Sequence, residues 1–367
     1  MLKLIFCGDT VPTPDSAHLF ASGDIGALFG DVIGCFSAAD RVIVNLECAL
    51  TDSDRAIKKF GPNLKGPPEA AQTLRKAGVT DCSLANNHVL DFGVAGLRDT
   101  ICALERAQLG WFGAGENAKL SRRPLTIEKD GFRVAVLAVA EHEYSYALAD
   151  QPGATPFEPF ETLTDIVQLK RTHDALVVLY HGGKEQCEYP SPRLRSACQA
   201  MTRLGADVVL CQHSHIIGCA EEYAGSTIVY GQGNFHFVHG DSQTPGWTSG
   251  LMVRLTWDGG VKIEYLPVIA EAHGIRLAQG ERREQVLKGF TQRSRQLLDG
   301  SWLQEWEAFC ASISTLYIGS VRDAFSDPDD PRKLEHFAHY LDCEAHTDVY
   351  RTLFKTWHAR HMDGARP

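Results

Sequence analysis

A short segment near residue 85 carries a cluster of side chains that can do chemistry. Asn86, Asn87, His88 and Asp91 follow directly after an apolar run. A carboxamide oxygen or an imidazole nitrogen can bind a metal or handle a proton, and a carboxylate within one turn can orient the imidazole ring. Taken alone, the pattern also fits a turn followed by a helix cap, so its interpretation depends on the rest of the chain.

Polar side chains also follow other apolar segments that have the composition of β-strands. These strand-end candidates are Asp9, Glu47, Asn87, His181, His213 and His215. Ligands of open α/β sheets gather at the carboxyl ends of strands, so we expect these side chains to lie close together. Two carboxylates, one carboxamide and three imidazoles suit two divalent metal ions that share a bridging carboxylate. Each histidine by itself is also compatible with a hydrogen-bonded scaffold residue.

The spacing of His213 and His215 is the most specific part of this set. In a strand or an extended loop, side chains at positions i and i+2 point the same way. We therefore expect both rings to face one site.

Strands and helices alternate over most of the chain, which predicts parallel strands joined by crossover helices. Apolar spacing predicts a single helix over residues 24–36. Asp130-Gly131 indicates a hairpin, and the segments 251–257 and 261–266 are expected to pair as antiparallel strands. Beyond about residue 273 the periodicity is helical. We predict an α/β domain over residues 1–272 and a helical C-terminal region over residues 273–367 packed on it.

Bulk composition narrows the class of protein. The 367 residues are 44% hydrophobic and 22% charged, which is ordinary globular composition. A formal net charge of −10 argues against non-specific binding to nucleic acid or to an anionic membrane. The eleven cysteines include no Cys-x-x-Cys pair, and no apolar run has the length of a signal peptide core or a membrane span. We therefore expect a cytoplasmic protein.

Several motifs, taken together and in order, resemble the bacterial CapA family, which is associated with capsule and poly-γ-glutamate synthesis. The resemblance extends over about residues 1 to 270, and its most specific element is Asn-Asn-His-x-x-Asp-x-Gly. The motifs are Gly8-Asp9, Asn45-Leu46-Glu47, the segment 84–93, His181-Gly182-Gly183, Gln212-His213-Ser214-His215 and the segment 230–235. The family belongs to the calcineurin-like metallophosphoesterase superfamily, so the resemblance implies a layered β-sheet sandwich flanked by helices.

The resemblance also implies roles for individual residues. Asp9 and His215 would hold one metal, Glu47 would bridge, and the second metal would be held by Asn87, His181 and His213. His88 would be the acid or a transition-state stabiliser rather than a ligand. Our mechanistic hypothesis is that His88 protonates the leaving group and that Asp91 holds its other ring nitrogen. The implied cofactor is a pair of divalent ions of Mn, Fe or Zn.

This chain departs from the superfamily pattern in its first motif. Superfamily members usually open with Asp-x-His, whereas the corresponding position here is Val11. The first metal would lose a ligand. CapA-like sequences generally share this loss, and they also share a glutamate where Glu47 stands.

Four further residues are weaker candidates for contact with substrate. Lys65 could meet an anionic group, although a loop lysine is usually solvated. His142 and Glu143 could line the pocket or form a polar turn, and Asn234 could orient a ligand or be a turn residue.

Three functions remain open from the sequence. The first is a dinuclear metallohydrolase that acts on a phosphoester of an anionic small molecule or polymer. The second is hydrolysis of an amide or isopeptide bond in a glutamyl polymer, because metal-activated water also attacks carbonyls. The third is a non-catalytic accessory protein of a polymer synthesis complex. The substrate, the metal and the oligomeric state are not determined by the sequence.

Overall fold

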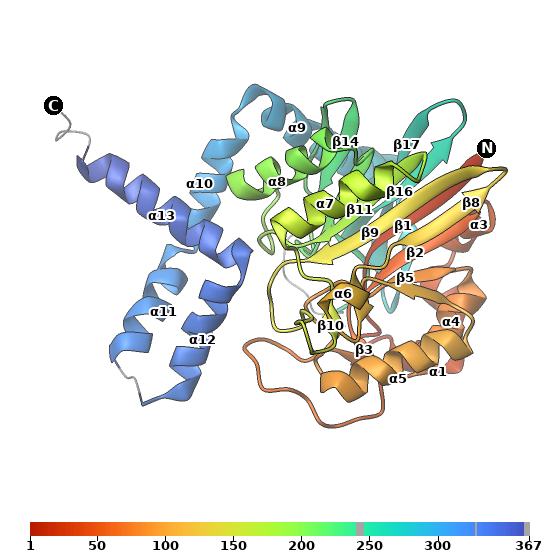
Figure 1. The fold of residues 1–367 in the computed structure, drawn as a ribbon, viewed down its shortest axis with the longest axis horizontal. Helices are drawn as coiled ribbons and strands as arrows, with labels where there is room; N and C mark the ends of the chain where they lie inside the picture. The colour runs from red at the N-terminus through yellow and green to blue at the C-terminus, as the bar shows by residue number, and fades with distance from the viewer. Residues whose placement is uncertain (240–245, 327–328, 363–367) are drawn as a thin grey trace.

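Two mixed β-sheets pack face to face at the centre of the protein, and helices cover their outer faces (Figure 1). The computed structural model describes residues 1–239, 246–326 and 329–362. In spatial order the first sheet contains β18 (Gly274–Leu277), β17 (Val261–Glu271), β16 (Ser249–Trp257), β1 (Leu2–Thr10), β2 (Arg41–Leu46), β5 (Asp81–Ser83) and β6 (Gly110–Phe112), and β15 (Asn234–His236) pairs with β1. The second sheet contains β13 (Ala220–Tyr223), β14 (Ser226–Tyr230), β12 (Val208–Gln212), β11 (Ala175–His181), β9 (Phe132–Ala140) and β8 (Leu125–Lys129).

The pairing directions agree with the alternation of strands and helices in the sequence. Strands β1, β2, β5 and β6 are parallel to one another, and so are β9, β11, β12 and β14. The predicted antiparallel pairs, β8 with β9 and β16 with β17, are both confirmed. The α/β fold class is therefore confirmed, with the carboxyl ends of the parallel strands of both sheets at one end of the sandwich (Figure 1).

The core between the two sheets is apolar. The second sheet places alternate residues in this core and in a second core on its outer face. Val134, Val136 and Ala138 of β9 belong to the core shared with the first sheet. Leu137 and Val139 of the same strand belong to the second core, under the outer helices. The sheet therefore has two buried faces, which explains why its strands are apolar runs rather than alternating patterns.

The helices form one group on each sheet and a third group at the C-terminus. The first sheet is covered by α1 (Ala17–Ser22), α2 (Ile25–Phe29), α3 (Val32–Ser37), α4 (Ala70–Ala77) and α5 (Gly93–Arg106). The second sheet is covered by α7 (Pro159–Lys170) and α8 (Pro192–Arg203). The short elements are β3 (Ala49–Leu50), β4 (Lys65–Gly66), β7 (Ala114–Gly115), β10 (Gly153–Ala154) and α6 (Ala118–Ser121).

The predicted single helix over residues 24–36 is wrong, because the structure divides it into α2 and α3. Gly30 ends α2 with a positive φ of 45°, a conformation that interrupts a helix and that glycine adopts readily. The apolar spacing continues across the break, and Phe29 and Phe36 both remain buried. Periodicity alone therefore could not reveal the break.

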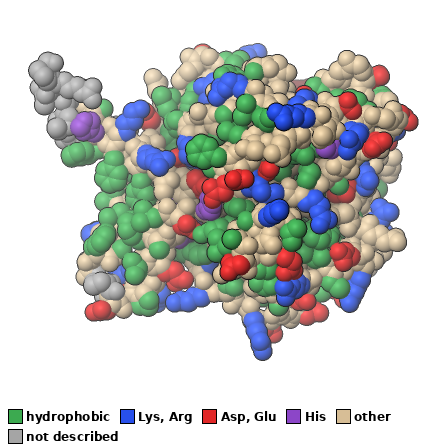
Figure 2. Space-filling view, viewed as in Figure 1, with side chains coloured by type: hydrophobic (Ala, Val, Ile, Leu, Met, Phe, Trp, Pro, Cys, Tyr) green, Lys and Arg blue, Asp and Glu red, His purple; other side chains and the backbone are tan. Residues whose placement is uncertain are grey.

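The C-terminal helices pack against the outer face of the second sheet and its helices. They are α9 (Gly280–Asp299), α10 (Trp302–Ser312), α11 (Ser314–Ser326), α12 (Pro331–Asp342) and α13 (Glu344–Met362). Trp306 and Tyr317 are buried in the same core as β11 and β12. The face in view carries many exposed apolar side chains over α11 to α13, whereas charged side chains are more frequent over the sheets (Figure 2). The division into domains at residue 272 stays a prediction.

Replacement of Gly8 tests how the core positions the end of β1. A Cβ at Gly8 would collide with the carbonyl oxygen of Gly233. We expect Gly8→Ala to lower the free energy of unfolding by about 1–3 kcal/mol, because backbone has to move next to Asp9. Urea denaturation measures this change.

Gly34→Ala is the matched control, because among the described residues no atom outside its chain neighbours and its own helix backbone lies within 4 Å of the position that its Cβ would take. Gly34 is in α3, so alanine should leave the stability unchanged or raise it by up to about 1 kcal/mol. Equal stabilities of the two variants would contradict this account of Gly8.

Candidate metal centre

The strand ends bring the six predicted ligands together at one end of the sandwich. Asp9 is the second-last residue of β1. Near this end of β1, shifts in register interrupt the pairing of β1 with β2 and β15. Such irregularities re-aim a side chain at a sheet edge. Glu47 follows β2, and His181 is the last residue of β11. Both sheets therefore contribute to one site.

Two groups of possible metal ligands share one carboxylate. Asp9, Glu47 and His215 form one group, and Glu47, His181 and His213 form the other. Within each group, one ligand atom of every residue lies within 4.8 Å of the others. The Nε2 atom of His181 is 3.2 Å from Oε1 of Glu47, and Nδ1 of His215 is 3.4 Å from Oδ2 of Asp9. Glu47 thus has the position of the bridging residue that the resemblance implies.

His213 and His215 do not lie in extended backbone as we expected. Both have positive φ angles, 88° and 59°, in the turn after β12. This conformation is uncommon for residues other than glycine, and strained backbone of this kind clusters at functional sites. Both residues still contact Asp9. The backbone N–H of His213 donates a hydrogen bond to Oδ2 of Asp9 at 3.1 Å, and His215 contacts the same oxygen through its ring, as given above. The common orientation comes from a tight turn rather than from strand geometry.

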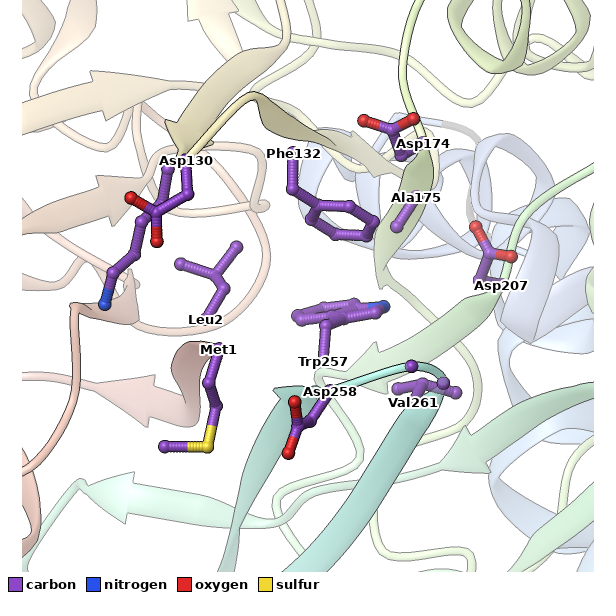
Figure 3. A pocket seen from close by; sticks show the side chains of 13 residues that line it. Met1, Leu2, Asp130, Phe132, Asp174, Ala175, Asp207, Trp257, Asp258 and Val261 are labelled. Carbon is purple, nitrogen blue, oxygen red and sulfur yellow. The ribbon is translucent and has the colours of Figure 1, made fainter.

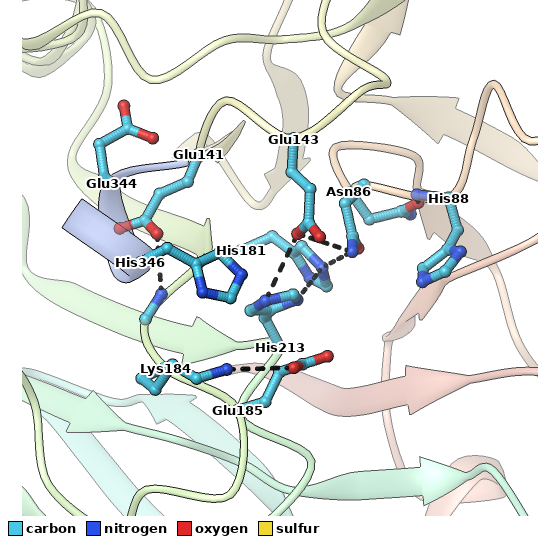
Figure 4. A network of polar contacts seen from close by, with 12 residues as sticks. Asn86, His88, Glu141, Glu143, His181, Lys184, Glu185, His213, Glu344 and His346 are labelled. Atoms are coloured by element: carbon cyan, nitrogen blue, oxygen red, sulfur yellow. Dashed lines mark hydrogen bonds and ion pairs between the residues drawn. The ribbon is translucent and has the colours of Figure 1, made fainter. Parts of the chain in front are cut away.

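Asn87 is the sixth predicted ligand, and its two amide atoms face different neighbours. Its Oδ1 lies 2.9 Å from Nε2 of His181, and its Nδ2 donates to Oε2 of Glu143 at 2.9 Å. Figure 4 shows the Glu143 carboxylate pointing towards His213. The amide is therefore oriented so that its oxygen faces the histidines.

Sequence reasoning missed one supporting residue, Asn45. Its Nδ2 donates to Oδ1 of Asp9 at 2.8 Å, and its Oδ1 accepts a hydrogen bond from Asn86 at 3.1 Å. Asn86 also donates to the carbonyl of Leu46 at 2.8 Å. These two carboxamides orient the ligand-bearing segments without being ligand candidates themselves. Asn45 lies two residues before Glu47 in the same motif. This proximity was the sequence signal that could have identified Asn45 as a supporting residue.

The donor set fits a divalent cation, and Glu47 is the clearest evidence. Its side chain is fully buried, and within the described part of the chain neither of its carboxylate oxygens has a hydrogen-bond partner. A buried carboxylate without partners is costly, and a bound cation removes that cost. Oxygen and imidazole donors in this combination suit Mn, Fe and Zn.

The electrostatics of the metal-free centre follow from burial and mutual contact. Burial disfavours the charged form of Asp9, but the contact with His215 and the charges of His181 and His215 lower the pKa of Asp9 to about 2. Burial also opposes the charge on His215, yet Glu47 and Asp9 raise the pKa of His215 to about 10. Burial lowers the pKa of His181 to about 4 and that of His213 to about 3. These two imidazoles are neutral near pH 7, and the neutral form is the one that binds metals.

His88 and Asp91 form the predicted pair, and a lysine joins them. Nδ1 of His88 is 2.6 Å from Oδ2 of Asp91. Nζ of Lys59 is 2.5 Å from Oδ1 of Asp91 and 3.1 Å from Nδ1 of His88. The side chain of Lys59 is only 3% exposed, although its segment reads as an exposed polar loop in the sequence. That polar composition concealed Lys59, because nothing local distinguishes it from its solvated neighbours.

The four weaker candidates have different surroundings. Lys65 donates to the carbonyl of Ser53 and to Asp54, and it does not line the cavity described below. His142 pairs with Glu344 at 2.7 Å and with Glu158 at 3.3 Å. Oδ1 of Asn234 is 3.0 Å from Nδ1 of His215, and Glu143 contacts Asn87. Asn234 and Glu143 therefore lie beside the ligand set, whereas Lys65 and His142 lie apart from it.

A cavity of about 560 Å³ opens over the candidate centre. Its lining includes Asn87, His88 and His215 from the predicted site, together with Lys59 and Lys184. Side chains of the C-terminal helices, including His339 and His346, form the opposite wall. Two of the candidate ligands, Asn87 and His215, thus share one space with His88 and two lysines.

A second cavity, of about 570 Å³, lies at the other end of the sheets, where the parallel strands begin (Figure 3). Its lining includes Leu2, Phe132 and Trp257, together with aspartates that already have partners. Asp174 accepts the backbone N–H of Arg133, and Asp207 accepts Lys170. We assign no site to this cavity.

None of the helices in the described residues combines the length and the apolar character that a membrane crossing requires.

Some known proteins similar to this chain are named for capsule or PGA biosynthesis. A family model described as "Bacterial capsule synthesis protein PGA_cap" matches residues 3–239. Capsule biosynthesis protein CapA of Bacillus anthracis is 35% identical over 188 residues, which are 50% of this chain and 46% of that protein. PGA biosynthesis protein CapA of Bacillus subtilis is 30% identical over 250 residues, 66% of this chain and 65% of that protein. The matches thus span about half to two thirds of the lengths of these relatives.

Among solved structures, calcineurin-like phosphoesterase YfkN of Bacillus subtilis aligns with a TM-score of 0.42 at 13% identity. The alignment covers 80% of this chain and 96% of that one. A likeness of this degree carries no information about activity.

The pH dependence of stability tests the buried state of Glu47. Burial and the neighbouring Asp9 raise the pKa of Glu47 from its ordinary value of 4.5 to about 8. The unfolded chain therefore releases this proton at lower pH than the folded one, so the stabilising contribution is complete below pH 4.5 and is lost as the pH rises towards 8. In metal-free protein we expect Glu47→Gln to remove a slope of up to about 1.4 kcal/mol per pH unit in this window. Calorimetry in EDTA between pH 5 and 8 measures it.

Glu221→Gln is the control, because Glu221 is a buried glutamate whose pKa is lowered by hydrogen bonds from Arg195 and Tyr230 against the effect of burial. This variant should keep the wild-type slope between pH 5 and 8. Parallel curves for wild type and Glu47→Gln would contradict the assignment.

Proposed function

The chain belongs to the bacterial capsule synthesis protein PGA_cap family, and from the geometry of its site we propose that it is a metal-dependent hydrolase that acts on a phosphoester. One observation carries the proposal. Glu47 is shared by two ligand groups, and His88, which is paired with Asp91, lines the same cavity as His215 of one group. Two adjacent cation positions beside a proton donor are the arrangement that phosphoester hydrolysis needs.

The proposed centre is dinuclear. Asp9 and His215 would hold one cation, Glu47 would contact both, and His181, His213 and Asn87 would hold the other. Bound divalent cations would supply Lewis-acid activation of a phosphoryl group and of water. Asn45 and Asn86 hold the ligand segments in place through the hydrogen bonds described above.

His88 is the proposed proton donor to the leaving group. Its Nδ1 is engaged by Asp91 and Lys59, which leaves Nε2 to serve a ligand in the cavity. Asp91 also accepts the backbone N–H of Leu64 at 2.6 Å, so its carboxylate is held from the loop side. Lys59 and Asp91 are positioning residues in this scheme, because they act through His88.

The cavity favours an anionic substrate. Lys59 and Lys184 both line it beside Glu143 and Glu185, and Lys59 is already paired with Asp91. Lys184 is therefore the cation of this lining that we assign to a reacting phosphate, where a positive charge stabilises the developing negative charge. Lys184 is paired with Glu185 at 3.2 Å and its side chain is 11% exposed, so its charge is partly compensated. The relatives' names place them in capsule and PGA biosynthesis. We propose a phosphorylated intermediate or product of such a pathway as the substrate class.

A second candidate is hydrolysis of a glutamyl amide bond. The observation in its favour is that the Bacillus subtilis relative is named for PGA biosynthesis. The same cations would polarise a carbonyl, and His88 would protonate the leaving amine. The same site chemistry suits both kinds of bond. Assays with phosphoesters and with glutamyl amides therefore separate the two candidate functions.

Replacement of His88 tests catalysis without loss of the cations. We expect His88→Ala to lower kcat on phosphoesters by about 10²- to 10⁴-fold, the usual contribution of a general acid, because no other group replaces its proton. The metal content, measured by mass spectrometry of the purified protein, should equal that of wild type. The assay uses aryl phosphate monoesters and diesters, nucleotides and γ-glutamyl anilides.

His18→Ala is the matched control, because His18 is exposed on α1 and takes no part in the centre. Its activity should equal that of wild type. Faster release from glutamyl anilides than from every phosphoester would favour the second candidate. Equal rates for wild type and His88→Ala would overturn both and leave the accessory role.

A further inference from the structure

A second cluster of metal-ligating side chains lies between the sheet edge and the C-terminal helices. It consists of Glu143, His339 and His346, and one ligand atom of each lies within 4.8 Å of those of the other two. Glu143 is in the loop after β9, His339 is in α12 and His346 is in α13. Of these three residues, only Glu143 was a candidate from the sequence, as a residue that could line the pocket or form a polar turn.

The three side chains are withdrawn from solvent and held from behind. The side chains of His339 and Glu143 are 6% and 14% exposed, and His346 is 7% exposed. The Tyr317 hydroxyl lies 2.5 Å from Nδ1 of His346, which leaves Nε2 of that ring for a ligand. The ring of His339 stacks on Tyr144, with centroids 5.0 Å apart. Partners on the far side of a ring that fix its orientation are typical of metal-binding histidines.

The contact between Glu143 and His339 in this cluster is too long for a hydrogen bond. Oε1 of Glu143 is 3.6 Å from Nε2 of His339, beyond the range of an N–H···O bond. The other oxygen, Oε2, already accepts the amide of Asn87. The cluster therefore has donor atoms that converge but do not satisfy one another.

We propose that Glu143, His339 and His346 form a third divalent-cation site, separate from the dinuclear centre. Two imidazoles and one carboxylate are the donor set of open Zn²⁺ sites, which keep a further position for water or substrate. All three residues line the cavity, so that position faces the space above the dinuclear centre. This site goes beyond the proposed hydrolase activity and does not depend on it.

The position of Glu143 gives the proposed site a structural consequence. Its carboxylate contacts Asn87 at 2.9 Å and lies 3.6 Å from Nε2 of His213, both predicted ligands of the dinuclear centre. Figure 4 shows Glu143 and His346 on two sides of the space beside His213 and His181. A cation bound here would join α12 and α13 to the loop that supports Asn87. It would thereby hold the helical wall of the cavity against the sheet edge.

Zinc stoichiometry of the full chain tests the proposal. Metal-free protein is dialysed against Zn²⁺, and bound zinc per chain is measured by mass spectrometry. We expect His339→Gln and His346→Gln each to bind about one equivalent less than wild type, because a two-donor site binds Zn²⁺ weakly. His336→Gln is the matched control. His336 is one turn away on α12, does not line the cavity, and stacks on Phe60, so this variant should bind as much as wild type.

The Glu47→Gln background separates this site from the dinuclear centre. In the Glu47→Gln variant, the one equivalent of bound zinc that depends on His339 should persist, even where zinc at the dinuclear centre is lost. Equal zinc content in wild type, His339→Gln and His346→Gln would overturn the third site, whatever the state of the dinuclear centre.

Chemical footprinting of wild type keeps the test independent of folding of the variants. Zn²⁺ should protect His339 and His346 from diethyl pyrocarbonate, whereas the exposed His18 should be modified equally with and without Zn²⁺. Unchanged modification of His339 and His346 on addition of Zn²⁺ would also overturn the proposal.

Discussion

The burial of charged and polar groups where two sheets meet is the constraint on which the site depends. Glu47 is fully buried, and among the residues that the structure describes neither of its oxygens has a hydrogen-bond partner; it lies beside a second buried carboxylate on Asp9. Water cannot solvate these groups, so their charge has to be compensated by protein or by a ligand. Without a bound metal, the positive charge of His215 balances the negative charge of Asp9, and a bound proton neutralises the carboxylate of Glu47. Cations would replace both kinds of compensation.

The scaffold meets this constraint with unusual backbone at the strand ends. The register of β1 shifts on both sides of Asp9, and His213 and His215 have positive φ angles. Regular strands would direct successive side chains to opposite faces, and only alternate residues would reach the site. The irregularities allow several ligands from short segments to converge. Gly8 belongs to the same arrangement, because only a residue without a Cβ fits beside the carbonyl of Gly233.

The sequence predicted the part of the site that is encoded at strand ends. Apolar runs that stop at a polar residue locate Asp9, Glu47 and His181, and parallel topology then brings these residues together. Lys59 could not be found in this way, because its burial results from contact with Asp91 across a polar loop. Lys65, six residues further, has the same local signal and a different environment. Two lysines in one loop are distinguished only by tertiary structure.

The C-terminal helices show a second kind of information that periodicity does not contain. In α12 the apolar spacing places His339 and Tyr340 on the buried side, but it does not say what they are buried against. His339 meets Glu143, almost two hundred positions earlier in the chain, because α12 packs over the loop that follows β9. The same helices share a core with the outer face of the second sheet, through Trp306 and Tyr317. The wall of the cavity is therefore attached to the scaffold by apolar packing at one side and faces the ligand-bearing loops at the other. Such a wall can order the space above the centre while it contributes polar groups of its own.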